Sequence, residues 1–223
     1  MAKSTDPSEK LVEAALDIAA EQGWRRVSPA GAAARAGLGI AHAYDCAGDR
    51  GRLLALIVRS VDLAVLRRID VEDEDPARER LFDVLMTRFD VLNEHRDAFL
   101  SILLELPESP AVALCSVPRL ETSMRWMLEA AGIEARGVAG GATVRGLCLL
   151  WIAVLRVWAA DDSADMARTM AALDQRLSQA EQWASSLTPR LEALDRFFVR
   201  AAETARSRGK RKVDSGPTDE LQA

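Results

Sequence analysis

Residues Ser28 to Leu54, SPAGAAARAGLGIAHAYDCAGDRGRLL, decide the fold of this chain. Ser28 is a typical helix N-cap, and Pro29 follows it at the first helical position, where its missing N–H costs nothing. Small residues continue this helix to Arg35. Gly37 ends it, because glycine readily adopts the left-handed backbone conformation found at helix ends.

A second short helix follows this turn almost at once. It is expected from Gly39 to about Asp45, and Asp49 then caps a third, long helix. Two short helices joined by a tight Ala-Gly turn form the pattern of a helix-turn-helix, whose second helix can enter the major groove of DNA.

The order of these features resembles the N-terminal domain of TetR-family transcriptional regulators over roughly residues 9–57. The resemblance rests on the stretches AALDIAAEQGW (14–24) and AARAGL (33–38), and on Tyr44 followed by DRGRLL (49–54). It implies a recognition helix beginning at Gly39, and a larger C-terminal domain that binds a ligand and forms the dimer.

The chain departs from the family pattern within the recognition helix. The family usually opens this helix with Ser or Thr, places Thr-Leu before the Tyr and Phe three residues after it. Here Gly39, His42-Ala43 and Ala47 occupy those positions, and Asp45 adds negative charge near the expected phosphates. The DNA-reading pattern is therefore diluted, whereas the fold pattern is intact.

Candidate DNA contacts follow from this register. Tyr44 and Arg50 suit phosphate binding, whereas His42 can reach a base edge and Ile40 a thymine methyl group. His42 is equally well read as a surface histidine without a role, and the two arginines after the first helix as solvated side chains. The full candidate set is Arg25, Arg26, Ser28, Arg35, Gly39, Ile40, His42, Tyr44 and Arg50.

Composition favours an all-α protein. The 223 residues are 49% hydrophobic but only 5% aromatic, and runs of β-branched residues are scarce. The net charge of −5 argues against a broad surface that binds nucleic acid nonspecifically.

Cys46, Cys115 and Cys148 show no pairing pattern, which predicts reduced thiols in a cytoplasm. The longest apolar run, 146–160, contains Arg156 and is expected to be too short to span a bilayer, so we expect a soluble, cytoplasmic protein.

Helical periodicity predicts the domain organisation. We expect a helix-turn-helix domain over 1–54, a helical ligand-binding and dimerisation domain over 55–186, and an amphipathic helix with a disordered basic tail over 187–223. Apolar stripes predict helices over 77–93, 96–106, 118–131, 142–160 and 164–184. The glycine-containing stretch 136–142 is interpreted as a turn.

Two functional surfaces are expected in the second domain. If the family resemblance holds, a small apolar ligand, with lipid included in that class, is expected in a cavity among its helices; plain core packing is the alternative. The residues expected to line it are Met86, Phe89, Leu103, Trp126, Met127, Leu150, Trp151 and Leu155.

The last two helices are expected to form a homodimer, with core packing within one chain as the alternative. The residues expected at this interface are Leu147, Val154, Trp158, Met166, Met170, Leu173 and Leu177.

The sequence offers little support for an enzyme. It carries no HExxH, CxxC, P-loop or nucleophile-elbow pattern, so we expect no catalytic residue, no metal site and no cofactor. The acidic cluster over 161–165 is explained by helix capping.

A second resemblance gives an alternative function. WAADDSADMARTMAALDQRL (158–177) resembles the C-terminal motif of ubiquinone-biosynthesis accessory proteins, which share the TetR fold, bind lipid and do not act on DNA. The basic amphipathic segment after Pro189 would then meet a membrane surface. The Asn-Trp-Tyr-Thr stretch of those proteins is missing, and Tyr44 with Asp49-Arg50 favours the regulator. The sequence therefore predicts a TetR-like dimeric regulator of a double-stranded DNA operator, acting as a repressor that a small apolar ligand releases.

Overall fold

The computed structural model describes residues 6–69, 75–105 and 110–182, with the backbone alone for 110–116. Among them the regular elements are helices, as the composition predicts. The segment expected over 187–223 lies outside the described residues, as does the side chain of Cys115.

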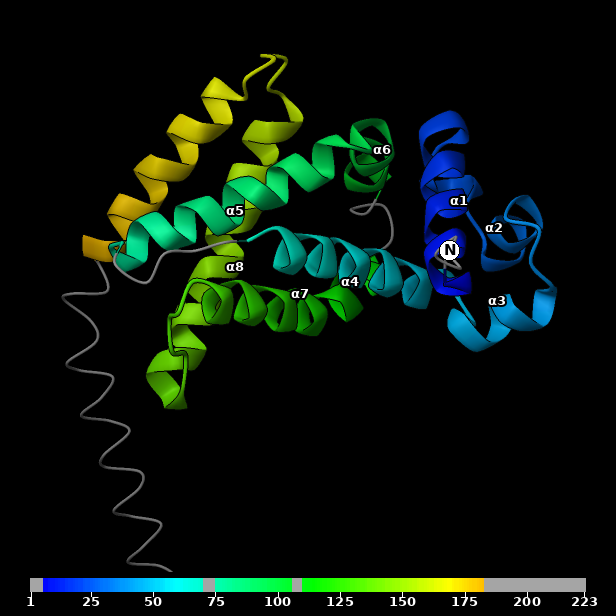
Figure 1. Cartoon of the computed structure of the whole chain (residues 1–223), viewed down its shortest axis with the longest axis horizontal. Helices are drawn as coiled ribbons and strands as arrows, with labels where there is room; N and C mark the ends of the chain where they lie inside the picture. Colours follow the sequence, from blue (N-terminus) through cyan, green and yellow to red (C-terminus); the bar gives the residue numbers. More distant parts are fainter. Residues whose placement is uncertain (1–5, 70–74, 106–109, 183–223) are drawn as a thin grey trace, which may run out of the picture.

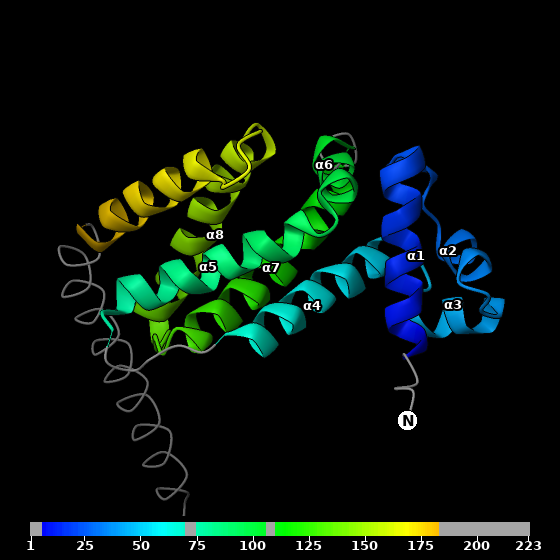
Figure 2. The ribbon, with the colours of Figure 1, turned by 45° about the horizontal axis from the view of Figure 1, so that its top comes forward.

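The N-terminal helices form a compact unit that we call the head. It consists of α1 (Pro7–Gln22), the short 3-10 helix η1 (Trp24–Arg26), α2 (Pro29–Arg35) and α3 (Ile40–Cys46). Figures 1 and 2 show the head at one end of the molecule, with α4 (Arg50–Arg68) leading away from it. The boundary expected after residue 54 thus falls inside α4, which belongs to both units.

The remaining helices form the body. They are α5 (Ala77–Asn93), α6 (Arg96–Glu105), α7 (Pro110–Ala130), α8 (Gly137–Ala159) and a last helix over 167–182. The end of α6 lies against α1 and η1, so the head is attached through α6 as well as through α4 (Figure 1).

Local capping explains where the head helices begin. The Asp6 side chain accepts a hydrogen bond from the Ser8 amide at 3.1 Å, and Pro7 starts α1. The Asp49 side chain accepts one from the Arg52 amide at 2.8 Å and starts α4. Both caps satisfy amides that have no partner within the helix.

Two body helices begin earlier than the sequence predicts. α7 begins at Pro110 rather than at 118, and Pro118 lies inside it. A proline inside a helix removes the hydrogen bond to the carbonyl four residues earlier and usually disrupts the helix there, and α7 nevertheless continues past Pro118. α8 begins at Gly137 rather than at 142, and a Cβ on Gly140 would lie 2.1 Å from the carbonyl carbon of Ala135. The glycine that suggested a turn instead permits a close approach of helix and backbone.

The last helix begins later than predicted, at residue 167 rather than at 164. Met166 has a φ of +53° and breaks the helical backbone just before it. The apolar periodicity continues through Met166, which is why the pattern alone places it in the helix.

Helix α8 is longer than the apolar run suggested. It has 23 residues, and by length and composition alone it could cross a membrane. Its most apolar window has a mean hydropathy of 1.8. The expectation that this stretch is too short for a bilayer is therefore wrong. Of that window 39% is buried inside the protein, and α8 contributes Trp151, Val154 and Trp158 to the body core.

Candidate nucleic-acid interface

The helix-turn-helix forms as the sequence predicts. The Ser28 hydroxyl accepts a hydrogen bond from the Gly31 amide at 3.1 Å and caps α2. Gly37 adopts a φ of +66°, and the Leu38 amide then donates to the Ala33 carbonyl at 2.8 Å. This left-handed turn closes α2 and sends the chain into α3. Gly39 precedes α3 and supplies no side-chain cap.

Alanines set the position of α3 in the head. Ala43 of α3 and Ala47 after it are buried, as are Ala32 and Ala33 of α2. Small side chains allow the two short helices to pack closely, and they fix which side of α3 faces the core.

The opposite side of α3 is open. Ile40 is 75% exposed and Tyr44 is 76% exposed, and Ala41, His42 and Asp45 are exposed beside them. Because α3 is the second helix of the helix-turn-helix, the one that can enter a major groove, this open face is the candidate nucleic-acid interface.

Arg35 is held by another helix. Its guanidinium donates two hydrogen bonds to the carboxylate of Glu21 on α1, one of them at 2.8 Å, and lies 3.8 Å from Asp17. The hydrogen bond from Arg35 lowers the pKa of Glu21, and the same bond raises the pKa of Arg35. Arg35 therefore ties α2 to α1 in this structure, and the DNA contact expected of it stays a prediction.

The other candidate arginines lie around η1 and the start of α4. Arg26 is exposed, and Arg50 donates from Nη1 to the Arg25 carbonyl at 3.3 Å. The Nε of Arg25 lies 3.9 Å from the Glu105 carboxylate at the end of α6. One side of this basic group is thus in contact with the body.

Helix α6 fixes the head through a second contact that the sequence did not predict. The amide of Trp24, a residue only 3% exposed, donates to the Ser101 hydroxyl at 2.7 Å. Ser101 and Glu105 lie one helical turn apart on α6, a spacing that places them on one face. That spacing was visible in the sequence, but nothing local indicated that the face meets the head.

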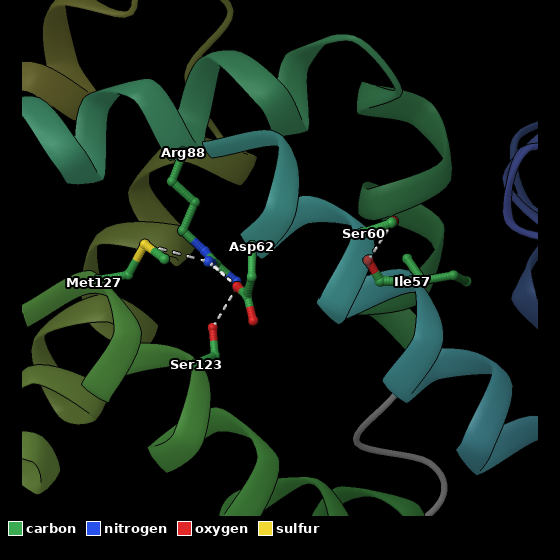
Figure 3. A network of polar contacts seen from close by, with 6 residues as sticks. All are labelled: Ile57, Ser60, Asp62, Arg88, Ser123 and Met127. Carbon is green, nitrogen blue, oxygen red and sulfur yellow. Dashed lines mark hydrogen bonds and ion pairs between the residues drawn. The ribbon is translucent and has the colours of Figure 1, made fainter. Parts of the chain in front are cut away.

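A buried polar network links α4 to the body (Figure 3). Arg88 of α5 forms an ion pair with Asp62 of α4, and the Ser123 hydroxyl of α7 donates to Asp62 at 2.7 Å. The guanidinium also lies 3.6 Å from the Met127 sulfur and 5.1 Å from the ring centroid of Trp151 on α8. Its Nε is buried and has no hydrogen-bond partner. No sequence pattern indicated this network, since its three polar members come from three helices.

The residues expected to bind a ligand divide into three groups. Phe89, Met127, Leu150 and Trp151 are buried, with the Phe89 and Trp151 rings stacked at 4.6 Å between centroids. Met86, Leu103 and Leu155 are half-buried at the edge of this core. Trp126 is 54% exposed on α7. Its expected place in an internal cavity is therefore wrong, because the turn of α7 that buries Met127 directs Trp126 outward.

The residues expected at a dimer interface mostly lie inside their own chain. Of the expected set only Met170 is exposed, at 39%. The other six are buried: Leu147, Val154, Trp158, Met166, Leu173 and Leu177. The most apolar stripe of each helix packs within the chain. The outer stripe of α8 carries Leu149, 71% exposed, and Ile152, 38% exposed.

The stretch 158–177 is accounted for by packing and capping. The Trp158 indole donates to Asn93 at 2.9 Å, and the Asp161 carboxylate accepts hydrogen bonds from the backbone and hydroxyl groups of Ser163 and Thr169. Arg96 donates to the carbonyl oxygens of Trp158 and Asp161, at 2.9 Å each. These contacts join α5, α6, α8 and the last helix.

The acidic residues do not assemble a metal site in the described part of the chain. No group of three potential metal-ligating side chains is found there. Hydrogen bonds from Ser163 and Thr169 occupy the Asp161 carboxylate.

Comparison with known proteins identifies the fold. No family model and no curated protein matches the sequence. A TetR transcriptional regulator from Nitrosomonas europaea aligns with 78% of this chain and 98% of its own, at a TM-score of 0.63 and 19% identity. One from Rhodococcus sp. RHA1 aligns with 79% of this chain and 97% of its own (TM-score 0.60, 17% identity). A TetR-family regulator from Streptomyces coelicolor aligns with 89% of this chain and 90% of its own (TM-score 0.55, 17% identity). The chain therefore has the fold of the TetR-family transcriptional regulators.

Proposed function

We propose that this protein is a dimeric transcriptional regulator that binds a double-stranded DNA operator through α3 and is released from it by a small apolar ligand, as a repressor is. The observation that carries the proposal is the exposed face of α3, with Ile40 and Tyr44 each about three-quarters exposed. The Tyr44 hydroxyl, with Arg26 and Arg50 on the neighbouring elements, supplies groups suited to phosphate contacts. Such a function involves no catalytic step. It requires a cytoplasmic location.

The proposed dimer uses the outer stripe of α8 together with the last helix. Leu149, Ile152 and Met170 are large apolar side chains exposed on these two helices. Pairing this surface with itself about a two-fold axis buries them and gives the protein two copies of α3. Helix-turn-helix dimers place such copies in successive major grooves.

The proposed ligand binds in the body. The half-buried side chains of Met86, Leu103 and Leu155 border the aromatic core, and their displacement would open space between α5, α6 and α8. Any change there reaches the head by the two connections described above, Asp62 on α4 and Ser101 on α6. A ligand that favours one arrangement of these helices shifts DNA affinity by its differential affinity for the two arrangements.

Fluorescence anisotropy with duplexes from the region upstream of the protein's own coding sequence tests DNA binding. We expect one site to bind far more tightly than nonspecific DNA, and the Tyr44→Ala/Arg50→Ala double variant to lose it. Arg136→Ala is the matched control, because it removes one exposed charge from the body, where its side chain is 83% exposed. Weak binding with equal affinity for all DNA sequences would contradict the proposal. Addition of apolar compounds to the complex then tests release.

Light scattering after size exclusion tests the dimer. Leu149→Glu places a charge in the proposed interface and should yield monomers. Leu104→Glu is the matched control, since Leu104 is 76% exposed and lies on α6, outside the two helices of the proposed interface. A Leu149→Glu variant with the mass of a dimer would contradict this interface.

A further inference from the structure

The exposed face of α3 is mostly apolar in its first turn, where a recognition helix reads bases, and His42 is the polar side chain exposed there. Ile40 and Ala41 are exposed in its first turn, and Tyr44 lies one turn further on. The helix, IAHAYDC, contains no Arg, Lys, Asn or Gln. Its hydrogen-bonding side chains are His42, Tyr44 and Asp45.

This composition restricts which bases α3 can recognise. Guanine is read most often by paired donors from Arg or Lys, and adenine by the amide of Asn or Gln. Neither kind of group is present on α3. Thymine differs from the other bases in carrying a C5-methyl group in the major groove, and small apolar side chains recognise that methyl by contact.

Two of the neighbouring arginines have carboxylate partners within the protein. Arg35, at the end of α2, donates to Glu21, and Arg25 lies near Glu105 of α6. Asp45 is exposed on α3 itself and disfavours a close phosphate on its side of the helix. Sequence recognition by α3 therefore depends on its first turn.

We propose that Ile40 and Ala41 read thymine C5-methyl groups, so that each half-site of the operator carries thymines facing the first turn of α3. Ile40 supplies a branched side chain that can cover one methyl, and Ala41 leaves room for the backbone to approach a second. Since specificity then comes from apolar contact, it is lost when the methyl is removed even though base pairing is unchanged. The inference rests on the proposed DNA-binding function.

Selection from a random duplex library, followed by base analogues, tests this inference. The full-length protein is used to enrich a binding sequence, and each thymine of that sequence is then replaced in turn by deoxyuridine, which lacks only the methyl. We expect one or two positions in each half-site where the substitution weakens binding about four-fold, the effect of exposing one methyl group. Cytosine at such a position should bind worse, and 5-methylcytosine should recover part of that loss.

Variants assign the effect to a residue. Ile40→Ala should bind the selected duplex more weakly and no longer distinguish thymine from deoxyuridine at one of those positions. Leu104→Ala, which removes an equally exposed apolar side chain from α6, should keep the distinction. An enriched site that tolerates deoxyuridine at every position would overturn the inference and leave the proposed function standing. A library that yields no enriched sequence would contradict both.

Discussion

The carboxylate of Asp62 on α4 is held inside the protein by the guanidinium of Arg88 on α5. The two side chains are 15% and 5% exposed, and Ser123 of α7 contacts Asp62 (Figure 3). The Arg88 guanidinium also lies over the ring of Trp151 on α8. An ion pair at this depth stabilises the fold only while both partners remain, because each charge has been removed from water. Its position on α4 makes it a buried polar attachment of that helix to the body.

Removal of one partner of this pair should be costly. Asp62→Ala leaves the Arg88 charge buried without a counter-ion, and we expect the free energy of unfolding to fall by about 3 kcal/mol. Urea titration followed by tryptophan fluorescence measures it. The double variant Asp62→Leu/Arg88→Met removes both charges and should be more stable than Asp62→Ala alone. A single variant within about 0.5 kcal/mol of the wild type would show that water already solvates the pair.

Asp161 should stabilise the protein in a pH-dependent way. Hydrogen bonds from Ser163, and then from Thr169, lower its pKa well below the ordinary value despite its burial. A lowered folded-state pKa means that the stabilisation is complete above the unfolded-state pKa, about 4, and shrinks as the pH falls below it.

The variant Asp161→Asn tests this dependence. At pH 7 we expect it to lose about 2 kcal/mol, because hydrogen bonds to a charged acceptor are replaced by bonds to a neutral one. The difference in urea midpoint between variant and wild type should be constant from pH 7 to about pH 5 and smaller near pH 3. Asp162→Asn, at the exposed neighbouring position, is the control and should change little at any pH. A difference that grows on acidification would contradict the assignment.

Local chemistry made the head predictable. The caps at Ser28 and Asp49 and the left-handed turn at Gly37 depend on residues within a few positions of one another, and all three are confirmed. The all-α composition likewise predicted the fold class correctly. These signals need no knowledge of tertiary packing.

The role of each site residue depends on which helices pack against one another. Because the sequence does not show this packing, it limited the prediction of the site. Arg35 has the right spacing for a DNA contact, yet Glu21 lies within reach once α1 packs on α2. Periodicity identified the apolar stripe containing Trp158 but could not tell core from interface, because both require the same residues. In the sequence, Arg88 could not be distinguished from a surface arginine. Its burial follows only from the packing of four helices.

Cys148 should react slowly with thiol reagents. Its burial, helped by the negative charge of Glu121, raises the pKa of the thiol to about 11. Since the thiolate is the nucleophile, labelling of Cys148 by iodoacetamide should be very slow at pH 7 and should rise about ten-fold per pH unit. Mass spectrometry of a Cys46→Ser/Cys115→Ser variant, which retains Cys148 alone, measures this rate. Rapid labelling at pH 7, with the fold intact by circular dichroism, would contradict the raised pKa.

Arg26 and Arg35 should differ in their contribution to DNA binding. Each phosphate contact made by an arginine releases counter-ions, so its loss lowers the slope of log affinity against log salt concentration by about 1. Arg26 is exposed at the end of η1, whereas the guanidinium of Arg35 is bound by Glu21. We therefore expect Arg26→Ala to reduce the salt slope and Arg35→Ala to leave it unchanged. Anisotropy titrations over a range of salt concentrations, on the same duplex, compare the two variants. Equal losses of slope would mean that Arg35 leaves Glu21 when DNA binds, and the Glu21→Gln variant would then bind DNA more tightly than the wild type.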